Sequence, residues 1–184
     1  RDDREPRLTL LPFLAKSIAL AVADQPRLNS HHHVDDATLE VFDAVHVGIA
    51  TQTDDGLLVP VVRHVESRAL HEVAGDLSVV TAAARDGSAT REQLSGSTIT
   101  ITSLGALGGL MSTPILNPPE VAIVGVNKIE TRPVWQDGQF VPRRIMNLSS
   151  SFDHRIVDGW DAATFVQRIR SLLESPALLF IGNG

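Results

Sequence analysis

The chain has 184 residues and a mass of 19.9 kDa; it is 43% hydrophobic, 21% charged, carries a net charge of −6, and contains no cysteine. This composition excludes a disordered chain and any disulfide or thiolate metal site, and the scattered basic residues exclude nucleic acid as the main partner. Its longest apolar runs are too short to cross a bilayer, so we expect no membrane partner. A monomer of this mass buries about 70% of its surface, which is enough for one domain.

The chain opens with a charged lead-in over residues 1–7, followed by an apolar segment of helical length at 8–23. Thr9 is placed to cap this helix, and Pro12 is tolerated because it falls in the first turn. A helix with so few polar residues is expected to be buried over most of its surface. Arg1 is not methionine, and we expect the chain to be part of a longer protein.

Residues 25–36 are interpreted as a polar connector that contains three successive histidines, His31–His33. Metal sites need ligands that converge in space, and adjacent histidines rarely do so, so we favour a solvated loop and predict no metal site. Residues 45–52 and 57–62 flank an Asp-Gly turn, and this pattern predicts a β-hairpin.

A second helix is predicted from a cap at Ser67 to about Arg85, because apolar residues recur there at helical spacing. Thr90 and Gln93 then have the spacing of a capping box. Residues 98–102 alternate between threonine and isoleucine, as expected for a strand with two different faces.

Further strands are predicted at 121–129 and 140–152, with Asp137-Gly138 as the turn that precedes the second one. A last helix follows Gly159 and stops before Pro176. Helices packed on a mixed, largely antiparallel sheet account for this order, so the fold class is α+β, an α/β two-layer domain.

The segment Ser151–Gly159 (SFDHRIVDG) concentrates the residues that are suited to chemistry, between a strand and the final helix. His154 has the one side chain with an unperturbed pKa close to neutrality. Asp158, four residues later, can fold back across a tight turn to organise the loop. Taken singly, these residues have ordinary structural explanations.

Taken as a string, Asp-His-Arg-x-x-Asp-Gly resembles the signature of the acyltransferases of 2-oxo acid dehydrogenase complexes, whose catalytic domain shares its fold with chloramphenicol acetyltransferase. The segment 8–16 (LTLLPFLAK) is similar to that family's Pro-Phe helix, and 55–63 (DGLLVPVVR) to its DGLxxPV strand. Residues 98–109 followed by 114–123 resemble its glycine loop and NPPE segment. The resemblance runs in matching order from Leu8 to about Leu179.

This resemblance implies transfer of an acyl group from dihydrolipoamide to coenzyme A. It makes His154 the general base that deprotonates the coenzyme A thiol, because the thiol is a poor nucleophile until then. It makes Thr102 the hydroxyl donor that stabilises negative charge on the carbonyl oxygen. It gives Asp158 the task of orienting the loop.

Five further positions match the family's coenzyme A contacts. An aspartate is common in the family at one of them, so a neutral amide there removes a charge from the contact. These positions are Thr9, Gln52 (the departure), Ser103, Asn127 and Lys128.

The resemblance also implies a homotrimer within a larger core. In that trimer, the loop that carries His154 in one subunit, the histidine loop, faces the strand before the glycine loop, which carries Thr102, in the next. Partners are then the E1 decarboxylase and the E3 dihydrolipoamide dehydrogenase, through the full-length chain. Lipoamide is carried on a separate lipoyl domain. We expect residues 8–184 to be a single catalytic domain without the family's N-terminal strand and helix, located in a bacterial cytoplasm or a mitochondrial matrix.

Two alternatives stay open: a noncatalytic scaffold subunit of the same fold, and a free-standing acetyltransferase that modifies a small molecule. The hydroxyl of Thr102 and the retained His154 argue against a scaffold, and the NPPE and DGLxxPV segments argue against the free-standing enzyme. The sequence gives two conflicting indications of which acyl group is transferred. The loop after Thr102 resembles branched-chain and acetyl members, whereas threonine in place of serine resembles the succinyl branch.

Overall fold

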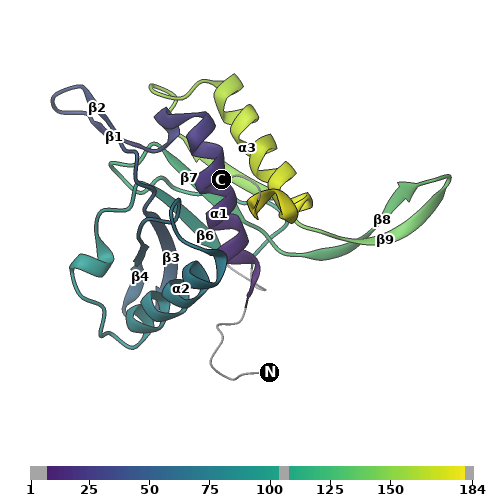
Figure 1. Ribbon diagram of the computed structural model, residues 1–184, viewed down its shortest axis with the longest axis horizontal. Helices are drawn as coiled ribbons and strands as arrows, with labels where there is room; N and C mark the ends of the chain where they lie inside the picture. Colours follow the sequence, from purple (N-terminus) through teal and green to yellow (C-terminus); the bar gives the residue numbers. More distant parts are fainter. Residues whose placement is uncertain (1–7, 104–107, 181–184) are drawn as a thin grey trace.

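The computed structural model describes residues 8–103 and 108–180, in which three helices cover one face of a sheet (Figure 1). The lead-in at 1–7 and part of the glycine loop, 104–107, lie outside these residues. No helix within the described ranges is long and apolar enough to span a membrane. The helices are α1 (Leu10–Asp24), α2 (Leu70–Arg85) and α3 (Gly159–Glu174), with short 3₁₀ turns η1 (Pro26–Leu28), η2 (Glu92–Leu94) and η4 (Pro176–Phe180).

The main sheet has the strand order β10-β7-β6-β3-β4, and a short β5 pairs with β3. The three neighbours β3, β6 and β7 are parallel, whereas β10, β4 and β5 are antiparallel to their neighbours. This arrangement confirms the predicted α+β class with its mixed sheet. The strands are β3 (Val47–Thr53), β4 (Gly56–Leu58), β5 (Val61–Val62), β6 (Ile99–Ser103), β7 (Ala122–Val126) and β10 (Leu148–Phe152).

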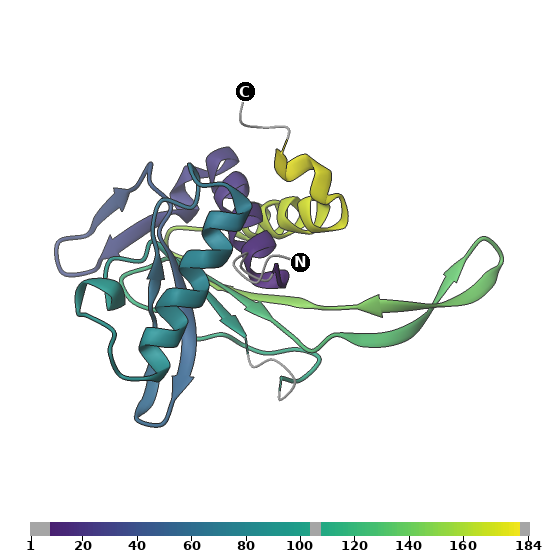
Figure 2. The ribbon, with the colours of Figure 1, turned by 60° about the horizontal axis from the view of Figure 1, so that its bottom comes forward.

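Two hairpins stand apart from the main sheet: β1 (Ser30–His33) with β2 (Thr38–Val41), and β8 (Glu130–Gln136) with β9 (Gln139–Ile145). The β8–β9 hairpin extends far from the body of the molecule (Figure 2). Its turn is Asp137-Gly138, with φ of 51° and 82°, so the predicted turn is confirmed. Positive φ at both positions is the geometry that closes a two-residue hairpin.

The core lies between the helices and the sheet, and α1 is buried on most of its surface, as its composition predicts. Along β6 the isoleucines Ile99 and Ile101 belong to this core, while Thr100 hydrogen-bonds to Glu120 away from it. The alternation of residues 98–102 therefore separates two faces as predicted. The largest fully buried side chains include Leu14, Ile18, Leu28, Phe165, Ile169 and Leu172.

The prediction of one strand over 140–152 is wrong, because the chain changes sheets there. Strand β9 ends at Ile145 on the projecting hairpin, and β10 begins at Leu148 in the main sheet. Between them, the Asn147 side chain donates to the Leu110 carbonyl at 2.7 Å, and the backbone carbonyl of Asn147 accepts from the Asn127 side chain at 2.9 Å. These hydrogen bonds to residues distant in sequence fix the segment in which the chain passes from β9 to β10.

Two expectations about the first half of the chain are also wrong. The segment His31–His33, taken as a solvated loop, forms β1 and is half-buried. The second helix begins at Leu70 rather than after a Ser67 cap, because the Ser67 hydroxyl donates to the His64 carbonyl in the preceding turn. The Glu72 carboxylate instead accepts from the Ala69 N–H at 2.8 Å.

Candidate active site

The loop between β10 and α3 presents His154 at the surface of the molecule. At its start, the Asp153 N–H donates to the Val121 carbonyl at 2.9 Å, which fixes the loop to the beginning of β7. The N–H groups of Ile156 and Val157 donate back to the Asp153 carbonyl at 2.9 and 3.0 Å. Val157 is buried. His154 therefore sits exposed on a turn that is anchored on both sides.

Asp158 closes this loop as the N-cap of α3. Its Oδ1 accepts from the N–H groups of Trp160 and Asp161, both at 2.9 Å. These are donors at the positive end of the helix, where a carboxylate is stabilised. The side chain thus fixes the loop's exit through the helix end, which is consistent with the orienting role expected of it.

We expect Asp158→Ala to lower the free energy of unfolding by about 1 kcal/mol, because two helix N–H groups lose their acceptor. Asp158→Asn keeps a capping oxygen and should retain most of that stability. Denaturant titrations of the two variants measure the difference. Equal losses in both would mean that the carboxylate charge, and not the capping oxygen, stabilises this end of the helix.

Asp153, beside His154, is held by two cationic or potentially cationic partners. Arg155 donates to both carboxylate oxygens, at 2.8 and 2.6 Å, and His32 Nδ1 lies 2.9 Å from Oδ2. The hydrogen bonds from Arg155 foremost, and that of His32, hold the pKa of Asp153 well below its usual range. An ionised Asp153 thus ties β1 to the histidine loop. Sequence analysis did not identify His32, since 121 positions separate the partners.

Five of the predicted site residues gather at a different place, the carboxyl edge of the three parallel strands. The register pairs Thr102 with Ala50 of β3 and with Gly125 of β7, so β3, β6 and β7 end side by side. Carboxyl ends of parallel strands are a common place for ligands. The five residues are Gln52, Thr102, Ser103, Asn127 and Lys128.

His154 and Thr102 do not meet within one chain. Thr102 is level with Gly125 and, through it, with Ser149 of β10. From there β10 runs three residues to Phe152, and His154 lies beyond that end. At a rise of about 3.3 Å per residue, this places the two side chains at least about 10 Å apart along the strands. The predicted base thus lies beyond the amino ends of the parallel strands, and the predicted oxyanion donor lies near their carboxyl ends.

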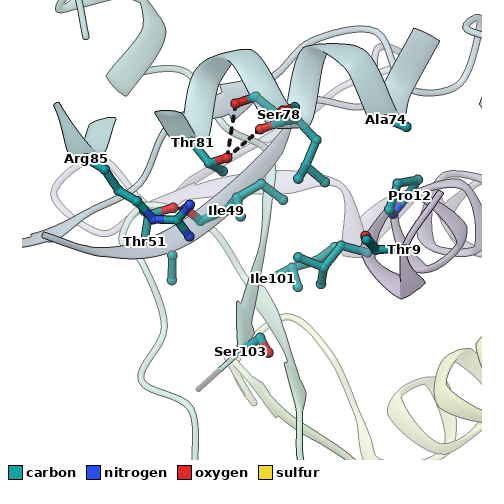
Figure 3. A pocket seen from close by; sticks show the side chains of 13 residues that line it. Thr9, Pro12, Ile49, Thr51, Ala74, Ser78, Thr81, Arg85, Ile101 and Ser103 are labelled. Carbon is teal, nitrogen blue, oxygen red and sulfur yellow. Dashed lines mark hydrogen bonds between the residues drawn. The ribbon is translucent and has the colours of Figure 1, made fainter. Parts of the chain in front are cut away.

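A cavity of about 530 Å³ opens at the carboxyl edge, between the sheet and helices α1 and α2. Thr9 at the start of α1 and Ser103 at the end of β6 both line it, so two of the predicted coenzyme A contacts share one space (Figure 3). Arg85 and Ser78 of α2 also line it. Sequence analysis did not select Arg85, because its place in the cavity depends on how α2 packs on the sheet.

The other three predicted contacts lie outside that cavity. Asn127 is buried and donates to the Asn147 carbonyl and the Ser149 hydroxyl, both at 2.9 Å. The Gln52 side chain is exposed and donates to the Thr53 carbonyl at 3.0 Å. Lys128 is half-exposed, with Nζ 3.7 Å from Glu130. Asn127 thus has a structural role in the geometry, and the contact role of all three stays a prediction.

Residues 1–181 match the family model of 2-oxoacid dehydrogenases acyltransferase (catalytic domain). The chain belongs to this family. It is 57% identical, over 97% of its length, to the lipoamide acyltransferase component of the branched-chain alpha-keto acid dehydrogenase complex of Pseudomonas putida. It is 37% identical, over 95% of its length, to the dihydrolipoyllysine-residue acetyltransferase component of the pyruvate dehydrogenase complex of Staphylococcus epidermidis.

The chain spans only 42% and 40% of the lengths of these two relatives. Among solved structures, the dihydrolipoamide acetyltransferase of Azotobacter vinelandii matches 95% of this chain and 72% of its own, with a TM-score of 0.89 and 38% identity. A chloramphenicol acetyltransferase matches 90% of this chain and 78% of its own, with a TM-score of 0.59 and 11% identity. At that identity the second likeness shows the fold alone, and it confirms the expected architecture.

This member of the acyltransferase family also carries a buried carboxyl group, Glu120, in its NPPE segment. Its Oε1 accepts from Ser97, from Thr100 at 2.9 Å and from Asn117 at 2.8 Å. Its Oε2 is buried and has no hydrogen-bond partner among the described residues. Burial raises the pKa of Glu120, and the three hydrogen bonds and nearby His31 oppose that shift.

A raised pKa makes the folded state bind this proton more tightly than the unfolded state, so the free energy of unfolding falls as pH rises through the folded pKa. We expect Glu120→Gln to remove that part of the pH dependence, with a smaller loss of stability between pH 5 and pH 8 than the unchanged chain shows. Denaturation midpoints at both pH values measure it. The exposed Glu92→Gln is the control, and equal slopes in all three proteins would contradict the prediction.

Proposed function

We propose that this chain transfers an acyl group from dihydrolipoamide to coenzyme A, as part of the core of a branched-chain 2-oxo acid dehydrogenase complex. Family membership supports the reaction class. The 57% identity to a branched-chain component, against 37% to a pyruvate dehydrogenase component, supports a branched-chain acyl group as the one transferred. The observation that carries the proposal is His154, exposed on a loop that is anchored at Asp153 and Asp158.

In the proposed reaction, His154 removes the proton from the coenzyme A thiol as the sulfur attacks the thioester carbonyl carbon. Thr102 donates a hydrogen bond to the carbonyl oxygen, which becomes negative as the tetrahedral intermediate forms. The imidazolium of His154 then returns its proton to the departing dihydrolipoamide sulfur when the carbon–sulfur bond breaks. Asp158 touches neither substrate in this scheme and positions the loop.

The spacing of these residues supports their roles. The structure of the Azotobacter vinelandii enzyme addresses a serine, a histidine and an asparagine in the catalytic mechanism, with the serine 52 positions before the histidine and the asparagine 4 after it. Thr102 precedes His154 by the same 52 positions, and Asp158 follows by the same 4. Threonine retains the hydroxyl donor of serine, and aspartate retains the side-chain oxygen of asparagine.

The cavity at the carboxyl edge fits one end of coenzyme A. Thr9 and Ser103 offer hydroxyl groups, and Arg85 supplies a cation for a phosphate group. Thr81, in the same wall, donates its hydroxyl to the Leu77 carbonyl at 2.7 Å, which leaves its lone pairs as acceptors. The cavity therefore offers hydrogen-bond donors, an acceptor and positive charge to a nucleotide or pantetheine chain.

We expect Arg85→Ala to raise the KM for coenzyme A by about 5- to 10-fold with little change in kcat, because one charge-assisted hydrogen bond is lost. Initial rates at varied coenzyme A concentration measure both constants. Arg91→Ala, an exposed arginine outside the cavity, is the control. An unchanged KM in the Arg85 variant would remove this residue from the binding site.

The proposed site forms between two chains of a trimer, since one chain keeps His154 and Thr102 at opposite edges of its sheet. The β8–β9 hairpin supports an assembly: its Trp135 and Phe140 rings are 63% and 69% exposed and stack edge to face at 5.0 Å. Exposed aromatic pairs on a projecting hairpin are typical of interfaces. A structural relative with a TM-score of 0.89 forms the cubic core of the pyruvate dehydrogenase multienzyme complex.

The remaining parts of the proposal follow from family membership. A lipoyl domain elsewhere in the full-length protein delivers the lipoamide, and the E1 decarboxylase and the E3 dihydrolipoamide dehydrogenase are the partners. A bacterial cytoplasm is the proposed location, in keeping with the Pseudomonas relative.

The acyl group is tested by comparing isobutyryl-, acetyl- and succinyl-dihydrolipoamide as donors to coenzyme A. We expect the highest kcat/KM with the isobutyryl donor, by about 10-fold or more over the acetyl donor, since each methylene in an apolar pocket contributes about 1–3 kcal/mol. A preference for acetyl would overturn the branched-chain assignment and leave the reaction class standing. No transfer from any donor would overturn the class.

A further inference from the structure

The β1–β2 hairpin brings two histidines and a glutamate together at the surface. His31 and His33 are two positions apart on β1 and so share one face, and Glu40 of β2 is the direct partner of His31 across the ladder. One ligand atom from each of the three side chains lies within 4.8 Å of the others. No other group of three or more potential metal-binding side chains of this kind occurs in residues 8–103 and 108–180.

A hydrogen bond to a backbone carbonyl fixes the tautomer of the His31 ring. Its Nε2 lies 2.7 Å from the Ser97 carbonyl oxygen. A carbonyl only accepts, so Nε2 carries the proton and the neutral ring keeps a lone pair on Nδ1. Histidines that bind metals almost always donate their second N–H to such an acceptor. The bond to Ser97 therefore orients His31 as a ligand independently of the other two side chains.

His33 and Glu40 complete the set. His33 Nε2 lies 3.3 Å from Glu40 Oε2, across the hairpin, and both side chains remain accessible, at 42% and 58% exposure. A tetrahedral zinc ion with bonds of about 2.0–2.1 Å holds its ligand atoms about 3.3 Å apart, so small side-chain rotations close the site. Asp36, in the turn of the hairpin, interacts electrostatically with His33, and its negative charge favours a cation.

We propose that His31, His33 and Glu40 bind a divalent zinc ion, with water in the fourth position. Two imidazoles and one carboxylate form a ligand set that zinc uses in proteins. The ion would fasten β1 to β2. Because His32, between the two ligands, holds Asp153 beside His154, the site would also stiffen the support of the histidine loop.

Isothermal titration of the assembled, untagged protein with zinc chloride at pH 7.5 tests the proposal. We expect one saturable site per chain, weakened at least 10-fold in His33→Ala and in Glu40→Gln. Both positions are accessible, so these variants should fold. His71→Ala, an exposed histidine on α2, is the matched control and should bind as the unchanged protein does. Cobalt(II) substitution should give the strong visible absorption of a tetrahedral site.

Absence of a saturable site would overturn the proposal, as would equal affinities of the His33 and Glu40 variants and the unchanged protein. An equal loss in His71→Ala would do the same, because it would show scattered binding to surface histidines.

Discussion

Replacing His154 with alanine is expected to lower kcat for acyl transfer to coenzyme A by about 10²- to 10⁴-fold, the range that a general base contributes. The thiol then meets the thioester without a group to take its proton. His154 is exposed, and the turn around it is held by backbone bonds from Asp153, Ile156 and Val157. The variant should therefore fold and assemble as the unchanged chain does, and KM should change little.

The measurement is the initial rate of acyl-coenzyme A formation at saturating donor. His71→Ala serves as the control for removal of an exposed imidazole. Undiminished activity in the His154 variant would refute the catalytic assignment. Thr102→Val, which deletes one hydroxyl from a half-buried strand position, is expected to lower kcat by about 10²- to 10³-fold through loss of an oxyanion donor.

Mixed assemblies of these two inactive variants distinguish a shared site from a site within one chain. If His154 comes from one subunit and Thr102 from the next, a co-assembled 1:1 mixture restores about a quarter of the sites. The subunit that supplies His154 is intact at that position in half of the cases, and so is the neighbour that supplies Thr102. If both residues served the same chain, mixing would restore nothing. Activity that stays at the level of the separate variants, in assemblies shown to be mixed, would contradict the shared site.

The parts of the fold that could be predicted are those that local sequence determines. The apolar run at 8–23, the Asp-Gly turn at 55–56 and the helix after Gly159 carry their own signals. The structure confirms both helices within a few residues and the hairpin, whose turn lies one residue earlier than predicted, at Asp54-Asp55. Strand β1 carries no such signal, because three adjacent histidines neither alternate nor contain a turn residue. It forms because β2 pairs with it and because His31 and His32 bond to Ser97 and Asp153, far along the chain.

The sequence predicts the identities of the candidate site residues, but it does not predict how they are arranged. The motif selects His154, Asp158 and Thr102, yet only the strand register shows that the first two lie at one edge of the sheet and Thr102 at the other. Arg85 is invisible to motif reasoning, because its place in the cavity depends on how α2 packs on β3. The missing information is tertiary in each case.

The same limitation applies to Lys16, which the sequence places in an apolar helix and the structure buries almost completely, at 3% exposure. Its ammonium group donates to three backbone carbonyls, those of Val65, Glu66 and Arg68, at 3.0, 3.1 and 2.8 Å. Three N–H donors thus meet three acceptors. Burial lowers the pKa of Lys16, while the nearby Glu66 charge opposes that shift.

We expect Lys16→Met to lower the free energy of unfolding by about 2–4 kcal/mol. Methionine fills a similar volume, so the loss comes from leaving three carbonyls of the segment before α2, one buried and two partly buried, without their donor. Denaturant titration of the assembled protein measures it. Lys128→Met, at a half-exposed lysine, should change stability by less than about 0.5 kcal/mol. A similarly small loss in Lys16→Met would mean that water replaces the ammonium group, and that the three carbonyls do not depend on this side chain for their hydrogen bonds.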